Sequence, residues 1–543
     1  MKKQISIPFL AALLLLVSSR LIAQGTPLPD TLQVNTIRAS FQSNGAFFLG
    51  GANGQFLVPA TSGAAPSISM MKSAGLWLAG RNSADNLHLS AQLYNENGKT
   101  DFYPGILSQD GIPYPEFNLI AGVTRDQVET HKSNPGSMIP AIYGWPGRGN
   151  EFFSNYHNFD LPFSQSSLAG FYDNSGNGKY NPDQGDYPVL EVRGCPLGYN
   201  ADETFWFPFH DVGPHTQSGG EPMNMEIQTE FFGFNCQEGS PVDRVVYVRY
   251  KLINRNTIPL FFCYFGMYLD FEIGNGGDDF IGCDPARRMV YAYNGDDLDE
   301  GGFETSSPIM AVDLLRGPLN NTATTDEEVD EWHFVPVDDA ELISPEQYYN
   351  VLAGRDPDGT PLPNNGLMYP GDPLNPAQWS EVSDGNAPGE RKAVASFGPF
   401  TMFPGAVNEL ILGYFWVRKG TNGNVKENLS VLAANDKYVQ DQYDNCFSLF
   451  GGCPVGVSTN TPTADLPVSV SPNPFKDWVQ VECNGSEMQS IYLYDATGRL
   501  LKTIFGNDAT AVSIQMSDLP LGIYGLQVLS KDGRTGYKGL IHH

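Results

Sequence analysis

The strongest candidates for metal binding or catalysis are the oxygen-bearing side chains of a glycine-rich segment, residues 173–186. Calcium loops place oxygen ligands at alternate positions, a glycine at the sixth position for a sharp turn, and an acid near the end. Gly178 fits this pattern, but the third and fifth positions are neutral and Gln184 replaces Glu at position twelve. We therefore predict a weak calcium loop, with a self-bonded polar turn as the alternative. The predicted ligands are Asp173, Ser175, Asn177, Lys179, Asp183 and Asp186.

A second acidic segment, residues 270–284, concentrates five carboxylates after an apolar run that predicts a buried strand. Like charges this close repel one another unless they are solvated or neutralised. A hard cation would neutralise them, and an exposed acidic loop is the alternative. The segment from Asn294 to Asp299 repeats the pattern more weakly. The predicted ligands are Asp270, Glu272, Asp278, Asp279 and Asp284.

Catalytic motifs are scarce. The sequence contains no Gly-x-Ser-x-Gly, no His-Glu-x-x-His, no Walker loop and no Gly-x-Gly-x-x-Gly opening a helix. One group could serve acid–base or metal chemistry in a hydrolase, although internally bonded or surface histidines are the simpler interpretation. It comprises His210, Asp211, His215 and Glu221. Four tryptophans could stack on sugars, but core packing is favoured; they are Trp77, Trp145, Trp206 and Trp416.

The composition indicates which elements position these residues. A chain of 543 residues is long enough for one large or two to three ordinary domains. High glycine and proline (58 and 40 residues) with 12% aromatics indicate many turns between aromatic-rich strands. The formal net charge of −29 disfavours nucleic acid as a partner, because phosphate binding needs cationic surface. It suits solubility and divalent cations instead.

Periodicity predicts a mainly β, sandwich-like region over residues 24–452, with few short helices and a possible division into two subdomains. The strongest strand signals run from Arg244 to Ile253, from Phe261 to Phe271 and from Glu409 to Val417. The Phe261 strand is almost wholly apolar, which predicts burial on both faces. One helix is predicted after Ser344 and another after Asn428, each residue acting as a helix cap.

Seven cysteines are compatible with disulfides if the chain is exported. None shows the close Cys-x-x-Cys spacing of zinc or redox motifs. Sequence does not fix connectivity, and several pairings are open. The simplest set is Cys446 with Cys453, Cys263 with Cys283 and Cys195 with Cys236, leaving Cys483 alone.

The N-terminus has the features of a secretory signal peptide, residues 1–23. Lys2 and Lys3 precede an apolar stretch, and a small-residue cleavage site ends at Ala23. The apolar stretch is too short to span a membrane, and no other stretch reaches about 18 apolar residues. We therefore expect the mature chain outside the cytoplasm and without a transmembrane span.

The last part of the chain alternates polar and apolar residues over short segments. Val479 to Cys483 and Val512 to Met516 both show this period of two, which is typical of half-buried strands. Turn signals separate these segments, so residues 466–543 predict a small immunoglobulin-like β-sandwich. A Thr-, Pro- and Ser-rich stretch, residues 453–465, predicts a linker before it.

The motifs of this C-terminal region resemble the type A C-terminal sorting domain of the type IX secretion system. They are a Pro-Asn-Pro entry, a Tyr-Asp-x-x-Gly-Arg turn and a Leu-x-x-Gly-Ile-Tyr strand, in that order. The resemblance implies export across a Gram-negative outer membrane, contact with the secretion machinery, and cleavage of the domain afterwards. The motif residues are Pro472, Asn473, Pro474, Asp495, Gly498, Arg499, Gly522, Tyr524 and Lys538.

The preceding region resembles a group of large secreted proteins that end in the same sorting domain and have no established activity. In that group the first acidic loop carries more carboxylates, whereas this chain has Ser175 and Asn177. The segments that carry the resemblance are Ala74–Gly80, Asp101–Gly105, Gly185–Pro188, His215 with Gly219 and Gly220, Asp278–Asn294 and Gly398–Phe400.

Together these features predict a secreted or cell-surface protein, non-enzymatic, with a role in binding, adhesion or surface structure and with structural calcium. An extracellular glycan or protein is the expected ligand. The alternatives are a secreted hydrolase acting on glycans or peptides near His210 to Glu221, and a structural subunit of a surface assembly.

Overall fold

The computed structural model divides the chain into two compact units, residues 1–455 and 456–543. Both are built mainly from antiparallel sheets, which confirms the predicted fold class. The predicted signal peptide and the linker at 453–465 lie outside the described residues. The structure describes residues 26–61, 63–162, 168–193, 195, 200–236, 240–321, 326–447, 467–483, 486–495, 500–506, 509–517, 519–531 and 535–542.

The first large sheet has the strand order β23-β24-β17-β6-β3-β2-β4-β5, with β1 beside β2 and β7 beside β6. Every pair in it is antiparallel. Its strands are β1 (Pro29–Leu32), β2 (Arg38–Gln42), β3 (Ala46–Phe47), β4 (Phe56–Pro59), β5 (Pro66–Ser69), β6 (Met71–Arg81), β7 (Leu87–Ala91), β17 (Leu260–Phe271), β23 (Trp332–Pro336) and β24 (Arg391–Met402).

The second large sheet has the order β11-β14-β15-β16-β25-β20-β19-β18, with β8 beside β14. It is also antiparallel throughout. Its strands are β8 (Tyr103–Pro104), β11 (Ala121–Thr124), β14 (Glu203–His210), β15 (Met225–Gly233), β16 (Val245–Asn254), β18 (Asp279–Asp284), β19 (Met289–Asn294), β20 (Ile309–Arg316) and β25 (Val407–Val417).

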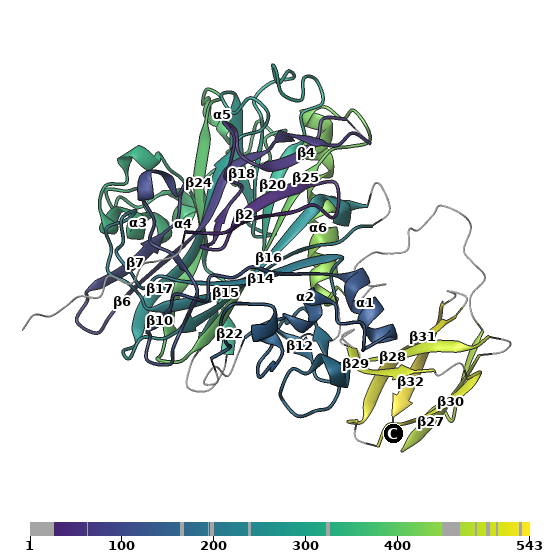
Figure 1. Ribbon diagram of the computed structural model, residues 1–543. Coiled ribbons are helices and arrows are strands. Elements are labelled where there is room, and N and C mark those ends of the chain that lie inside the picture. The colour runs from purple at the N-terminus through teal and green to yellow at the C-terminus, as the bar shows by residue number, and fades with distance from the viewer. Residues whose placement is uncertain are drawn as a thin grey trace, which may run out of the picture. The chain divides into compact units, whose positions relative to one another are not determined.

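The two sheets enclose one large apolar core, so the first unit is a β-sandwich (Figure 1). Each strand contributes alternate residues, such as Leu76 and Leu78 from β6 and Val246 and Val248 from β16. This alternation follows from the period of two along a strand. Full burial of one such side chain contributes about 1.5–3 kcal/mol, so the core is the main source of stability.

Helices cover the outer faces of the sandwich. Helix α6 (Val425–Asp444) lies on the second sheet, where Leu432 and Val439 join an apolar cluster with residues of β20 and β25. Helix α3 (Pro345–Leu352) lies on the first sheet, where Tyr348 packs against Trp77. Both outer faces are therefore shielded from solvent at these helices.

The helix starts test the capping predictions. Ser344 and Gln347 form the expected capping box of α3. The predicted start of the second helix was wrong by one turn, because Asn424 caps α6 together with Glu427. Asn428 lies inside the helix and accepts a hydrogen bond from the backbone of Lys419, at 2.7 Å.

The three strongest strand predictions are confirmed as β16, β17 and β25, with bounds that differ by one or two residues. Burial of β17 on both faces is incomplete, because Phe262 lies at a bulge and is 60% exposed. All four tryptophans considered for sugar stacking are instead buried in the core, as favoured. They are Trp77, Trp145, Trp206 and Trp416.

Shorter elements complete the first unit. No described helix is both long and apolar enough to cross a membrane. The two-stranded pairs are β9 (Ile106–Leu107) with β10 (Pro113–Tyr114), β12 (Phe171–Tyr172) with β13 (Tyr187–Pro188), and β21 (Leu319–Asn321) with β22 (Asp326–Glu328). The remaining helices are α1 (Arg125–Ser133), α2 (Pro140–Tyr143), α4 (Pro363–Gly366), α5 (Glu381–Asp384) and five short 3-10 turns, η1 (Glu96–Gly98), η2 (Phe153–Asn155), η3 (Pro182–Gln184), η4 (Pro241–Arg244) and η5 (Asp339–Glu341).

The second unit is a small sandwich with its own apolar core, which includes Phe475, Val481, Leu493 and Leu526. One sheet has the order β26-β27-β30 and the other β29-β28-β31-β32. The strands are β26 (Val468–Ser471), β27 (Trp478–Cys483), β28 (Met488–Asp495), β29 (Leu500–Phe505), β30 (Ala511–Gln515), β31 (Gly522–Ser530) and β32 (Thr535–His542).

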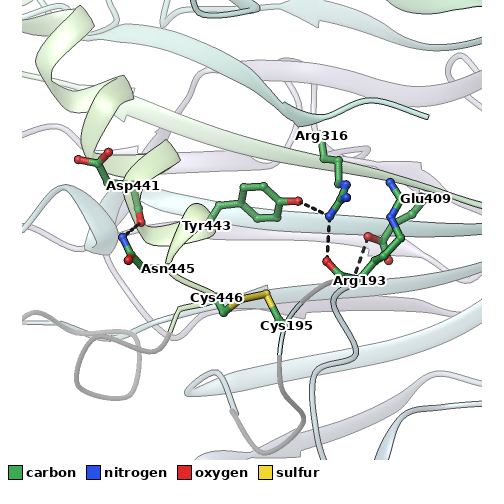
Figure 2. The surroundings of a disulfide bond; sticks show 8 residues. All are labelled: Arg193, Cys195, Arg316, Glu409, Asp441, Tyr443, Asn445 and Cys446. Carbon is green, nitrogen blue, oxygen red and sulfur yellow. Dashed lines mark hydrogen bonds between the residues drawn. A yellow bond between two sulfur atoms is a disulfide. The ribbon is translucent and has the colours of Figure 1, made fainter. Parts of the chain in front are cut away.

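The disulfides differ from the predicted set. Cys195 bonds to Cys446, with their Cα atoms 5.4 Å apart although 251 residues separate them (Figure 2). Cys236 is also disulfide-bonded. Cys263 and Cys283 are free and buried, and they lie in different sheets. All three predicted pairings were therefore wrong, because the fold joins segments that are distant in sequence.

Candidate functional site

The first acidic loop connects β12 and β13 and folds around the carboxylate of Asp173. One oxygen of that carboxylate accepts from the backbone N–H of Gly176 at 2.7 Å, and the other accepts from that of Gly178 at 2.6 Å. The bond from Gly178 contributes most to lowering the pKa of Asp173 below its ordinary value. Both glycines have positive φ and their Cβ positions face open space. The loop therefore supplies its own donors.

The other predicted ligands of this loop are also bonded within it or to its neighbours. Asp186 accepts from two backbone N–H groups, at 2.9 and 2.7 Å. Asn177 accepts from the backbone of Lys179 at 2.8 Å, and Ser175 donates to Asp173 at 3.2 Å. Asp183 accepts from a tyrosine hydroxyl, that of Tyr143, at 2.5 Å. The arrangement is that of a polar turn which needs no cation to satisfy its oxygens.

The second acidic segment is divided between different surroundings. Asp270 accepts from the hydroxyl of Tyr94 at 2.6 Å and lies near Lys392. Asp284 forms an ion pair with Arg287 at 2.5 Å. It lies five residues from Asp279, at the other end of β18. Five residues of strand span roughly 16 Å. Asp284 therefore does not join the other predicted ligands around one ion. Tyr94 engages one oxygen of Asp270, and the other oxygen is buried without a partner among the described residues.

The remaining predicted carboxylates, Glu272, Asp278 and Asp279, lie near the open end of the β18–β19 hairpin, away from its turn. Asp279 opens β18 directly opposite Asn294 in β19, and both side chains are buried. Directly opposed residues point to the same face of a sheet. One oxygen of Asp279 accepts from the backbone of Ile273 at 3.0 Å. Its other oxygen and the amide oxygen of Asn294 are buried and find no donor in the described part of the chain. A buried acceptor without a partner costs about 1–3 kcal/mol.

Asp299 closes this cluster from the loop after β19. Its two oxygens accept from the backbones of Asn275 and Phe303 at 2.9 and 2.7 Å. Gly274 and Gly302 pack directly against the carboxylate, and a Cβ at either position would lie within 2.1 to 2.3 Å of its oxygens. Glycine is therefore required at both positions for the loops to approach this carboxylate.

The electrostatics of the cluster favour a proton or a cation. Burial, followed by the charge of Asp299, raises the pKa of Asp278 to about 6. Burial raises the pKa of Asp279 well above its ordinary range, and the charges of Asp278, Asp299 and Glu272 raise it further. One oxygen of Asp278 is also buried without a donor. Ionisation of all four carboxylates, those of Glu272, Asp278, Asp279 and Asp299, is unfavourable unless a positive charge lies among them.

The side-chain geometry limits how such a cation would be held. Within the described part of the chain, no three His, Cys, Asp or Glu side chains converge on one point suited to a metal ion. A cation at the hairpin end would therefore use one or two carboxylates together with the Asn294 amide, backbone carbonyls and water. Calcium accepts such mixed oxygen shells. Asn294 and Asp299 complete the cluster, and the weak acidic repeat after β19 was their only sequence signal.

The histidine group is occupied by structural bonds. Both ring nitrogens of His215 lie 2.7 Å from carbonyl oxygens, those of Leu89 and Asp211. The Asp211 carboxylate is fully buried and accepts from the backbones of Met223 and Met225 and from a serine hydroxyl. Burial lowers the pKa of His210 to about 3. Glu221 is exposed. These residues offer no free acid–base pair in this arrangement.

The motif residues of the C-terminal unit support its sandwich. Asn473 accepts from the backbone of Ile541 at 3.0 Å, which ties the Pro472–Pro474 entry to β32. Asp495 ends β28 opposite the buried Tyr524 of β31, which Gly522 opens, and Lys538 is exposed on β32. Gly498 and Arg499 lie outside the described residues.

Comparisons with known proteins identify the second unit. Residues 469–542 match the family model described as a secretion system C-terminal sorting domain. The C-terminal unit is thus the predicted sorting domain, and the chain is a type IX secretion substrate. A search of curated proteins finds no match.

Two solved structures show weak similarity. One is titled a polysaccharide lyase, with 10% identity and a TM-score of 0.19, over 65% of this chain and 38% of that one. The other is a DUF3244 family protein with an immunoglobulin-like β-sandwich from Bacteroides vulgatus, with 16% identity and a TM-score of 0.11, over 14% of this chain and 95% of that one. At these TM-scores neither similarity carries an argument about function.

Proposed function

We propose that the exported chain is a non-enzymatic surface or secreted protein, with a binding, adhesive or surface-structural role and with calcium stabilising its sandwich. One observation carries the calcium proposal. The buried oxygens of Asp279 and Asn294 face the same side of the hairpin without a donor. A divalent cation would satisfy both and would neutralise the neighbouring carboxylates.

The proposed role of calcium is structural. Asp279 and Asn294 lie at the open end of the β18–β19 hairpin, away from the turn that connects the strands and at the edge of the second sheet. Glu381 of α5 accepts a hydrogen bond from the backbone of Ile281 in the same edge strand, at 2.7 Å. Calcium there would hold the loops before β18 and after β19 against this edge. Its affinity depends on few carboxylates, so we expect weak binding of the kind found in extracellular modules.

The non-enzymatic assignment is supported by the histidine group, whose polar atoms are engaged in holding backbone segments together. The sorting domain supports export, contact with the secretion machinery and an extracellular or cell-surface location. An extracellular glycan or protein remains the expected ligand. Hydrolysis of a glycan or peptide panel that is lost in His215→Ala, with an unchanged melting temperature, would favour the hydrolase alternative.

The test is differential scanning calorimetry of the chain from residue 24 onward, in calcium and in EDTA. Calcium at a hundredfold excess over its dissociation constant adds about 2.7 kcal/mol of stability, so the melting temperature should rise. Asp279→Asn should abolish the rise without lowering stability in EDTA, because the neutral amide keeps an acceptor for the backbone of Ile273 and adds a donor beside the buried amide oxygen of Asn294. Asp173→Asn is the control for the first loop and should leave the rise intact.

The outcomes separate the two loops. A calcium-dependent rise that disappears in Asp173→Asn and persists in Asp279→Asn would move the site to the first loop. An identical melting temperature in calcium and in EDTA, with no calcium found by elemental analysis, would refute structural calcium altogether.

A further inference from the structure

Two arginines whose guanidinium groups form no ion pair within the described residues lie beside the disulfide on the outer face of the second sheet. Figure 2 shows Arg193 and Arg316 close together, next to Tyr443. The guanidinium of Arg316 donates through Nη1 to the carbonyl oxygen of Arg193 at 2.8 Å and to the hydroxyl of Tyr443 at 3.1 Å. The side chains therefore form one connected group.

This group has more donors than acceptors. The Nε and one Nη of Arg193 and the Nε of Arg316 are buried and have no hydrogen-bond partner among the residues that the structure describes. A guanidinium has five N–H donors and no acceptor, so such atoms can be satisfied only by an incoming acceptor. The Tyr443 hydroxyl accepts from Arg316, which leaves its own O–H to donate.

The nearby carboxylates are engaged by other cations. Arg249 pairs with Glu409 at 2.6 Å and with Glu230 at 3.3 Å. The other two pairs are Lys251 with Glu191 at 2.9 Å and Arg288 with Glu328 at 2.6 Å. Neither Arg193 nor Arg316 forms an ion pair with a carboxylate of the described residues, although the backbone N–H of Arg193 donates to Glu409 at 3.3 Å and the charge of Glu409 acts on its guanidinium. The five cations of this region face four carboxylates, which leaves a local excess of one positive charge.

The disulfide fixes the spacing of this group. Cys195 follows Arg193 by two residues, and Cys446 follows Tyr443 at the end of α6. The bond therefore holds the Arg193 segment against the helix, and β20 supplies Arg316. Burial, with the charge of Arg316, lowers the pKa of Arg193 below its ordinary value, and an anion between the two groups would relieve both effects.

We propose that Arg193 and Arg316, with the Tyr443 hydroxyl, bind an oxyanion: the group shared by carboxylates, sulfates and phosphates. Adjacent guanidinium groups match the planar pairs of oxygens that such groups present. The net charge of −29 repels anions at long range. Binding must therefore be local, and it does not depend on the calcium proposal.

The test is isothermal titration calorimetry of the chain from residue 24 onward, in calcium-free buffer without a carboxylate chelator, with sodium sulfate, sodium phosphate or sodium acetate. Sodium chloride keeps the ionic strength constant. We expect saturable binding of at least one probe, and at least about tenfold weaker binding in Arg193→Gln and in Arg316→Gln. Arg148→Gln, an exposed site with the same loss of charge, should bind as the wild type does.

The arms of the experiment distinguish the sources. A response to sulfate and phosphate alone indicates a tetrahedral anion, and a response to acetate alone indicates a carboxylate; either supports the proposal. Anion-dependent melting temperatures give a second readout for any variant that folds less stably. The proposal is overturned if no probe binds saturably, or if both glutamine variants retain wild-type affinity.

Discussion

The two acidic, glycine-rich loops of the first unit have similar compositions and opposite physical situations. The loop of residues 173–186 is largely exposed, and backbone N–H groups solvate its carboxylates. The loops around Asp279 and Asp299 are packed at the end of a sheet, where buried oxygens outnumber their donors. Ligand-like spacing therefore does not identify a cation site by itself. What distinguishes the sites is whether the fold leaves buried oxygens that accept no hydrogen bond from the described residues.

The largest expected difference comes from one substitution made in both loops. Gly178→Ala places a side chain at positive φ in open space, which costs about 1–2 kcal/mol. Gly274→Ala incurs the same backbone cost, and its Cβ also meets the Asp299 carboxylate, which adds about 1–3 kcal/mol. Urea denaturation of both variants measures the difference. Equal losses would mean that the loop at Gly274 is less tightly packed than the structure shows.

A second comparison replaces one buried aspartate in each loop. Asp186 and Asp299 each accept from two backbone N–H groups, so either change to asparagine should cost about 1–3 kcal/mol. Only Asp299→Asn should also reduce the stabilisation by calcium. Denaturation of each variant in calcium and in EDTA tests this. A calcium effect lost in Asp186→Asn instead would assign the cation to the first loop.

The loops should also differ in the sign of their pH dependence. The raised pKa of Asp278, about 6, means that its contribution is full below the unfolded pKa and is lost as pH rises through about 6. The lowered pKa of Asp173 acts oppositely, so its contribution is present above the unfolded pKa and is lost as pH falls.

The measurement is urea denaturation in EDTA between pH 3 and 8. Asp278→Asn should flatten the decline on the neutral side, and Asp173→Asn should reduce the loss on the acid side. Differences from the wild type isolate each residue, because Asp270 and Glu230 also have pKa values raised to about 7, chiefly by burial. A wild-type profile in Asp278→Asn would contradict the assignment.

The smallest effect is expected at a buried acid pair that lacks a glycine loop. Burial raises the pKa of Asp436 on α6 to about 7, and burial and the adjacent Asp436 raise that of Asp313 on β20. The amide of Asp436→Asn donates a hydrogen bond at any pH, whereas the carboxyl group donates only when it is protonated. Stability should therefore rise by about 1 kcal/mol at pH 8 and not at pH 5. The change should not alter the calcium response. A changed calcium response in Asp436→Asn would contradict the assignment of calcium to the Asp279 site, because it would mean that buried oxygens outside that site also respond to calcium.

Much of the fold was predictable because it depends on local periodicity. Runs of apolar and β-branched residues predict the strands β16, β17 and β25, and the capping residue Ser344 predicts the start of α3. The start of α6 was missed because two asparagines, Asn424 and Asn428, could both cap it. Only the position of Glu427 relative to Asn424 selects between them.

The candidate sites were predictable only in part. The sequence indicated the acidic segments, but it grouped Asp270 and Asp284 with Asp279, although Tyr94 and Arg287 engage them elsewhere. The arginine pair had no sequence signal, because residues 193 and 316 are joined through a disulfide and a helix end that are distant in the chain.

The sequence by itself determined the export route and the mainly β architecture, because sorting motifs and strand periodicity depend only on residues that are close together in the chain. The tertiary structure decided which cysteines pair, which carboxylates lose their solvent and which arginines lack a counter-charge. These properties depend on burial and on contacts between distant segments. An aspartate in the first loop is a turn residue solvated by backbone N–H groups, whereas an aspartate at the packed sheet end is a candidate cation ligand, because only there do buried carboxylate oxygens lack donors among the described residues.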